Sequence, residues 1–314
     1  MGQGRRALEK EQKQRREQRS KLVTRVAVAI VMICLVTAGI FAYFYTRGYA
    51  KVARISTSYC NAGVNKGWWL SYSFNESAPT LETRQQVSQK GSRVIDEINK
   101  LARSIPQIRE IVSHFSEYKL SVSGVIRGQE GRLTVQTISG QKNGKSIEIC
   151  HFPLTLDNGV IGYSPRNNAI FFPAREMPLC LETTLIAHEL DHAADPKAKE
   201  AEKYEDSDHS QYELEPYKLC WRILDHYTQG VFSSTVKRIV DRTNNQSVEA
   251  ALGQITINDF KTITKALGHD DKYTRGSVVT QLTTAVAWEA IRRHHKGSME
   301  EWKLAYQRLG KLYH

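Results

Sequence analysis

One ten-residue stretch constrains the fold of this chain more than any other. Residues 185–194 read Leu-Ile-Ala-His-Glu-Leu-Asp-His-Ala-Ala. His188 and His192 are four residues apart, so a helix places both imidazoles on one face, where they can bind a single metal ion. Apolar side chains follow a stripe on almost the opposite face: Ile186, Leu190 and Ala193. We therefore expect a helix that packs with one face and binds a metal ion with the other.

Two acidic residues within this stretch extend the metal hypothesis. Glu189 follows the first histidine and is placed to accept a proton from a metal-bound water. Asp191 points near the same histidines and is expected to orient one of them through a hydrogen bond. The chain has 10 histidines in 314 residues, so the five-residue pattern should arise by chance only about 0.02 times. The alternative interpretation is a surface helix with two solvated histidines.

A third metal ligand is expected from the next helix. Catalytic zinc is held by three protein ligands and keeps one open position for water. Residues 212–217 read Tyr-Glu-Leu-Glu-Pro-Tyr and open an amphipathic helix, so Glu213 or Glu215 can complete the set. The charged segment before this helix offers weaker candidates: Asp206, Asp208 and His209.

With these residues, the chain resembles zincin metallopeptidases of the gluzincin type, in which a second helix donates a glutamate after the His-Glu-x-x-His helix. The resemblance covers residues 169–227. It implies that Glu213 is the third ligand, with Glu215 as the alternative, and that Tyr217 supports one of the histidines. The chain departs from the family pattern at Pro216, where alanine is usual, and at Tyr217, where an acid or amide is usual.

The resemblance implies one catalytic Zn²⁺ and a metallopeptidase that hydrolyses peptide bonds of a peptide or protein substrate, with Glu189 as the general base. An electrophilic group for the oxyanion is expected from candidates that include Tyr204, Tyr212 and His209. Two other classes of function stay open. One is a non-catalytic, membrane-anchored zinc-binding or assembly/sensor module, and the other is an interaction protein that acts through its basic tail.

The N-terminal region predicts a membrane anchor. Residues 1–25 carry nine Lys/Arg and three Glu, a net +6 of the chain's +11, and residues 26–46 carry no charge. Twenty-one residues of helix span about 30 Å, the thickness of a bilayer core. We therefore expect a transmembrane helix at residues 26–46, a cytoplasmic N-terminus and a periplasmic or extracellular C-terminal domain. A cleaved signal peptide is the alternative, and no nucleic-acid partner is expected.

Cysteine usage is consistent with this placement. Four cysteines follow the expected span, an even number in a compartment where disulfides persist: Cys60, Cys150, Cys180 and Cys220. We expect Cys180 to pair with Cys220, because a bridge between them would join the two metal-bearing helices. Cys60 would then pair with Cys150. Unpaired buried thiols are the alternative.

The rest of the chain predicts an α+β fold: an N-terminal transmembrane helix, a stalk at residues 47–81, and a mainly helical zincin-like domain at residues 82–314. Residues 83–118 favour two helices divided at Pro106. Residues 119–172 favour a small antiparallel or mixed sheet, with hairpin signals at residues 142–144 and 164–167. The metal site is expected within residues 182–227, and further helices within 231–314. The strand before the metal helix is expected to offer its edge to a peptide.

Overall fold

The computed structural model describes residues 23, 26–28, 30–32, 34, 36, 47–60, 81–126, 129–139, 144–152, 161–165, 167–173, 177–197, 210–243 and 247–313. The chain divides into two compact units, Met1–Arg47 and Gly48–His314. All of the elements described below belong to the second unit.

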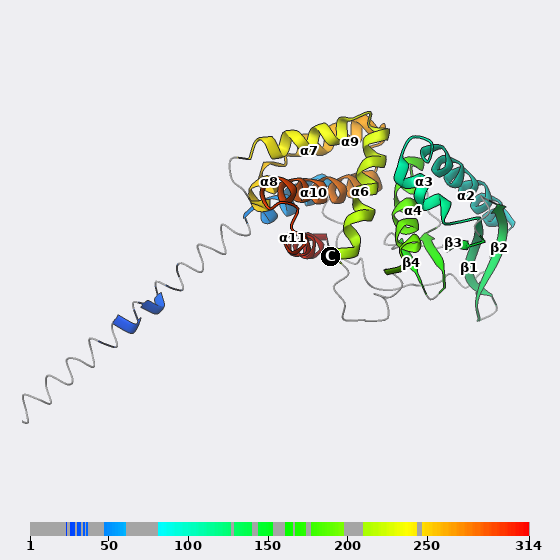
Figure 1. Ribbon diagram of the computed structural model, residues 1–314, viewed down its shortest axis with the longest axis horizontal. Helices are drawn as coiled ribbons and strands as arrows, with labels where there is room; N and C mark the ends of the chain where they lie inside the picture. The colour runs from blue at the N-terminus through cyan, green and yellow to red at the C-terminus, as the bar shows by residue number, and fades with distance from the viewer. Residues whose placement is uncertain are drawn as a thin grey trace, which may run out of the picture. The chain divides into compact units, whose positions relative to one another are not determined.

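The second unit is mainly helical and contains a small sheet (Figure 1). Its helices are α2 (Leu81–Leu101), α3 (Pro106–Ser113), α4 (Leu179–Ala194), α6 (Ser210–Tyr227), α7 (Val231–Asp241), α8 (Val248–Gln254), α9 (Ile257–Leu267), α10 (Lys272–His294) and α11 (Met299–Tyr313). Its strands are β1 (Glu117–Ile126), β2 (Gln129–Ser139), β3 (Ser146–Phe152), β4 (Gly162–Ser164) and β5 (Ala169–Pro173). The predicted helix break at Pro106 is confirmed, since this proline begins α3.

The five strands form one mixed sheet in the order β2-β1-β3-β5-β4. The pairs β1 with β2 and β4 with β5 are antiparallel, so the predicted hairpin around residues 164–167 is confirmed. β3 instead runs parallel to both β1 and β5. The predicted hairpin at residues 142–144 is therefore wrong, because β3 pairs with the edge of β1 that β2 leaves open.

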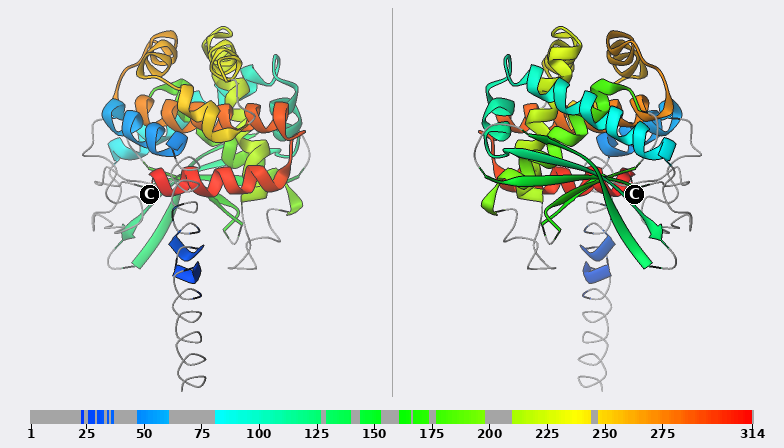
Figure 2. Two further views of the ribbon diagram at one scale, coloured as in Figure 1. Left: turned by 90° about the vertical axis from the view of Figure 1, so that its left-hand side faces the viewer. Right: turned by 90° about the vertical axis from the view of Figure 1, so that its right-hand side faces the viewer.

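Helices α2 and α4 contact the sheet and form the second layer of this half of the fold (Figure 2). Tyr118 and Leu120 of β1 are buried in this layer while Lys119 between them is exposed, as expected for a strand with one covered face. The apolar stripe of α4 belongs to the same hydrophobic cluster: Ile186, Leu190 and Ala193. The packing face predicted for the metal-motif helix is thus confirmed.

A second hydrophobic cluster lies among the C-terminal helices, where α10 contacts each of α6, α7, α8, α9 and α11. Residues 48–60, which we expected to belong to a stalk, are helical and contribute Tyr49, Val52 and Tyr59 to this cluster. Helix α6 contributes to both clusters, with Leu214 in one and Leu219 in the other. It therefore joins the helical half to the half that contains α4.

The predicted transmembrane helix is contradicted by the structure. Crossing a bilayer takes about 20 consecutive, mainly apolar helical residues, and none of the helices in the described part of the chain meets this requirement. Within residues 26–46, the described helical residues are 26–28, 30–32, 34 and 36, and the remainder lies outside the described residues. Three further predictions depended on this transmembrane helix and are contradicted with it: single-pass topology, a cytoplasmic N-terminus, and a periplasmic or extracellular domain.

The predicted disulfides are also wrong, because none of the five cysteines forms a disulfide. The Sγ atom of Cys220 lies in hydrogen-bond contact with His188 and with the backbone of α4 instead. Cys180 and Cys60 both pack against the helical cluster, and burial raises the pKa of the Cys60 thiol to about 11. These cysteines therefore correspond to the alternative that we left open, unpaired thiols that are largely buried.

Candidate metal centre

The two motif histidines of α4 converge on one point. The Nε2 atoms of His188 and His192 lie 3.3 Å apart, and their rings meet edge to face with centroids 4.9 Å apart. Their side chains are 12% and 15% exposed. The four-residue spacing on a helix produces this arrangement, because the apolar stripe on the other side of α4 fixes the helix rotation.

Helix α6 brings one of its two candidate carboxylates to this point. An oxygen of Glu213 lies 3.3 Å from Nε2 of His188, and the other oxygen lies 3.5 Å from Nε2 of His192. Glu215 is 71% exposed and forms an ion pair with Lys218 at 2.6 Å. The two glutamates are two residues apart and therefore cannot share one helix face.

The three side chains form a donor set that suits zinc. One ligand atom from each of His188, His192 and Glu213 lies within 4.8 Å of the other two. In a tetrahedral site with zinc–ligand distances of about 2.0–2.1 Å, adjacent ligand atoms are about 3.3 Å apart, which is close to the separations seen here. Two imidazoles and one carboxylate also leave a fourth position for water or substrate. Among the described residues, this is the one such group of three.

The electrostatics of Glu213 match a ligand role. Burial favours its neutral form, but hydrogen bonds from His188 and His192 outweigh this effect and hold the pKa of Glu213 well below its ordinary value. The carboxylate is therefore ionised at neutral pH, as coordination of a cation requires.

Glu189 lies beside the cluster and is held by the sheet. The backbone N–H of Tyr163, in β4, donates a hydrogen bond of 2.8 Å to Oε2 of Glu189. Burial, together with the negative charge of Glu213, raises the pKa of Glu189 above its ordinary value, although the two histidines oppose the shift. A carboxylate with a raised pKa is suited to accept and return a proton. The sequence did not indicate Tyr163, because its contribution comes from the backbone.

Tyr217 lies one turn after Glu213 and contacts the site through its ring. The ring meets that of His188 edge to face, with centroids 5.2 Å apart. The Tyr217 hydroxyl forms a hydrogen bond with Tyr306 of α11, whose ring centroid is 5.8 Å away. The expected contact of Tyr217 with a histidine is therefore present as ring packing. The Tyr217 hydroxyl instead contacts Tyr306, which the sequence did not indicate.

The remaining predicted residues divide into two groups. Asp191 is partly buried and interacts electrostatically with both histidines. Within the described chain it makes no hydrogen bond to either of them. Tyr212 lies in the first turn of α6. Four candidates lie outside the described residues, as part of the segment 198–209: Tyr204, Asp206, Asp208 and His209.

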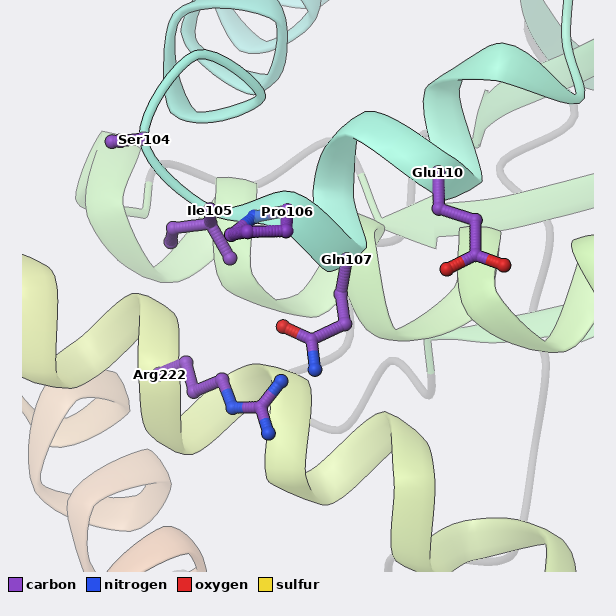
Figure 3. Close-up of a pocket in the computed structure, with 6 residues that line it drawn as sticks. All are labelled: Ser104, Ile105, Pro106, Gln107, Glu110 and Arg222. Atoms are coloured by element: carbon purple, nitrogen blue, oxygen red, sulfur yellow. The ribbon is translucent and has the colours of Figure 1, made fainter.

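A depression lies between α3 and α6 and is lined by none of the residues of the histidine cluster (Figure 3). The residues that line it are Ser104, Ile105, Pro106, Gln107, Glu110 and Arg222. It contains no histidine or cysteine and a single carboxylate, so it offers no metal donor set, and its one hydroxyl, that of Ser104, donates a hydrogen bond to the Leu101 carbonyl oxygen. The chemistry of the described residues is therefore concentrated at the His188 cluster.

Comparison with known proteins found no family model, curated protein or solved structure that matches this chain. The resemblance to gluzincins therefore rests on the motif residues and remains a prediction.

Proposed function

We propose that this protein is a zinc-dependent metallopeptidase that uses His188, His192 and Glu213 as ligands and Glu189 as general base. The observation that carries the proposal is the convergence of three ligand atoms from two helices within 4.8 Å of one another, with the Glu189 carboxylate beside them. Structural zinc sites are usually closed by four protein ligands, whereas three ligands are typical of catalytic sites.

When bound, zinc polarises a substrate carbonyl and lowers the pKa of a coordinated water towards about 7. Side chains of the protein then accept and return the proton. Glu189 accepts a proton at its carboxylate, which the Tyr163 N–H orients, and returns it to the leaving amine. The raised pKa of Glu189 favours this exchange, because a base works best when its pKa approaches the working pH.

Tyr306 is our candidate for the group that stabilises the oxyanion. The hydroxyls of Tyr306 and Tyr217 share a hydrogen bond, in which either group can be the donor. Burial, together with the negative charges of Glu213 and Glu189, keeps the pKa of Tyr306 above its ordinary value, so its hydroxyl stays protonated and able to donate. A hydroxyl donor beside the reacting carbonyl is the kind of group that stabilises developing negative charge.

The position of β4 favours an extended peptide as the substrate. β4 lies at one end of the strand order and contacts α4. A peptide strand that adds to this edge would run past Glu189, because Tyr163 of β4 already contacts that carboxylate.

The proposal is tested by incubating the full chain, with zinc supplied, with a mixture of unrelated peptides and identifying products by mass spectrometry. We expect cleavage by the parent, loss on chelation, and a large loss in the Glu189→Gln variant, with zinc content retained. The matched control is Glu215→Gln, which changes an exposed glutamate. A zinc-loaded parent that cleaves no peptide would contradict the peptidase proposal and favour a non-catalytic zinc-binding module.

A further inference from the structure

One face of α6 carries three residues that all contact the histidine cluster. Glu213, Tyr217 and Cys220 are spaced at i, i+4 and i+7, which places them on a single helical stripe. Glu213 faces both Nε2 atoms, and Tyr217 packs its ring on His188. Cys220 lies one turn farther along, behind the imidazole of His188.

The thiol of Cys220 is fully buried and makes two contacts with α4. Its Sγ atom lies 3.5 Å from Nδ1 of His188 and 3.7 Å from the carbonyl oxygen of Thr184. Both distances suit hydrogen bonds that involve sulfur. In the described part of the chain, Nδ1 of His188 is bonded to no carboxylate or carbonyl oxygen.

The direction of each hydrogen bond follows from what the atoms can do. The Thr184 carbonyl oxygen only accepts, so the S–H group donates to it. The sulfur then presents a lone pair to Nδ1 of His188, which must carry the proton of the neutral ring. With the proton on Nδ1, the Nε2 lone pair is available toward His192 and Glu213.

We propose that Cys220 is a positioning residue for the metal site: its thiol accepts the Nδ1–H of His188 and fixes the tautomer and ring orientation that a metal ligand needs. The inference rests on the proposed zinc site. Histidine ligands usually donate their second N–H to a carboxylate, a backbone carbonyl or water, and here a buried thiol takes that place. The free state of Cys220 is thereby explained, since a disulfide would remove the S–H donor.

Replacement of this thiol has a defined consequence. In Cys220→Ala, the Nδ1–H of His188 loses its acceptor in a buried site, and the ring loses the contact that fixes its orientation. Loss of a hydrogen-bond partner behind a ligand typically weakens metal affinity by about 10-fold to 100-fold. In Cys220→Ser, a smaller hydroxyl can still accept from Nδ1 and donate to the Thr184 carbonyl, so most of the affinity should return.

The test measures zinc affinity of the full chain by competition with a chromophoric chelator for the parent, Cys220→Ala, Cys220→Ser and Cys150→Ala. Cys150 is a matched control, because its side chain is also fully buried but lies in β3. A second readout is the tautomer of His188 in the zinc-loaded protein, obtained from long-range ¹H–¹⁵N NMR spectra. Thermal melting followed by circular dichroism checks that each variant folds.

We expect Cys220→Ala to bind zinc at least about 10-fold more weakly, with partial rescue by serine, no change in Cys150→Ala, and a proton on Nδ1 of His188 in the parent. A folded Cys220→Ala variant with parental affinity would overturn the positioning role while leaving the zinc site intact. So would a parent spectrum without a proton on Nδ1. A parent that binds no zinc would overturn the proposed function and this inference together.

Discussion

The buried carboxylate of Glu182 gives the most quantitative prediction about the helix that carries the metal motif. Glu182 lies in the first turn of α4 and is 2% exposed. Its oxygens lie 3.3 Å from Nζ of Lys90 in α2 and 3.7 Å from Nε2 of His151 in β3. These contacts join the start of α4 to the neighbouring helix and to the sheet. Removal of the carboxylate would leave a buried imidazole and a lysine without this partner.

The magnitude follows from the geometry. Two unit charges 3.3 Å apart interact by about 5 kcal/mol at an effective dielectric constant of about 20, and desolvation of both groups offsets part of this. Removal of one partner of a buried pair typically costs about 3–5 kcal/mol. Lys90 is 28% exposed, so we expect a loss of unfolding free energy at the lower end of this range. We predict that Glu182→Ala lowers the free energy of unfolding by about 3 kcal/mol.

The assay is urea unfolding of the full chain at neutral pH, followed by circular dichroism. Glu215→Ala is the matched control and should change stability by less than about 0.5 kcal/mol, because an exposed ion pair contributes little. A double-mutant cycle with Lys90→Met isolates the pairwise energy. A loss below about 1 kcal/mol in Glu182→Ala would contradict this prediction, since it would mean that the buried carboxylate contributes no more than a surface group.

Three further predictions concern other parts of the second unit. Asp271→Ala should cost about 1 kcal/mol in urea unfolding, because the Asp271 carboxylate accepts two backbone N–H bonds at the start of α10. A hydrogen bond from the Thr274 hydroxyl, together with these two bonds, outweighs burial and lowers the pKa of Asp271, so its contribution is complete above the ordinary value of about 3.9. The difference between parent and variant should therefore shrink as the pH falls through the lowered pKa, and a constant difference would contradict this. Tyr306→Phe should reduce kcat for peptide cleavage with zinc affinity unchanged, and an unchanged kcat would remove Tyr306 from the mechanism. Gly48→Ala should destabilise the fold in thermal melting, because a Cβ there would lie 1.9 Å from a backbone oxygen, whereas Gly253→Ala meets its nearest atom at 3.9 Å and should not.

The metal helix could be predicted from the sequence because local spacing determines it. The four-residue separation of His188 and His192, together with the apolar stripe opposite, specifies both the helix and the direction of the face that carries the histidines. Neither feature depends on distant contacts. The structure confirms both of these local predictions.

The residue pattern alone left Glu213 and Glu215 open, and only the resemblance to gluzincins favoured Glu213. Both lie near the start of the same helix, and which of them faces α4 depends on how α6 rotates between two hydrophobic clusters. The contributions of Tyr163 and Tyr306 depend on the same tertiary arrangement, since one comes from a strand backbone and the other from the last helix.

The predicted hairpin at residues 142–144 and the predicted disulfides failed for a related reason, because they also depended on tertiary contacts. A turn signal at residues 142–144 predicted a hairpin, but strand pairing is non-local, and β3 joined β1 in parallel. The even number of cysteines after the expected membrane span, in a compartment where disulfides persist, predicted two disulfides. The number of cysteines does not show which of them lie close enough to form a bond. Cys220 lies against His188 and the backbone of α4 instead.

The most direct test of the central claim is the zinc content per mole of the purified full chain, measured by elemental mass spectrometry after zinc loading and removal of excess metal. The parent, His192→Ala, Glu213→Ala and Glu215→Ala are measured together. We expect one zinc in the parent and in Glu215→Ala, and a loss of zinc in both His192→Ala and Glu213→Ala. A folded parent without zinc, or retention of zinc in Glu213→Ala with loss in Glu215→Ala, would contradict this expectation.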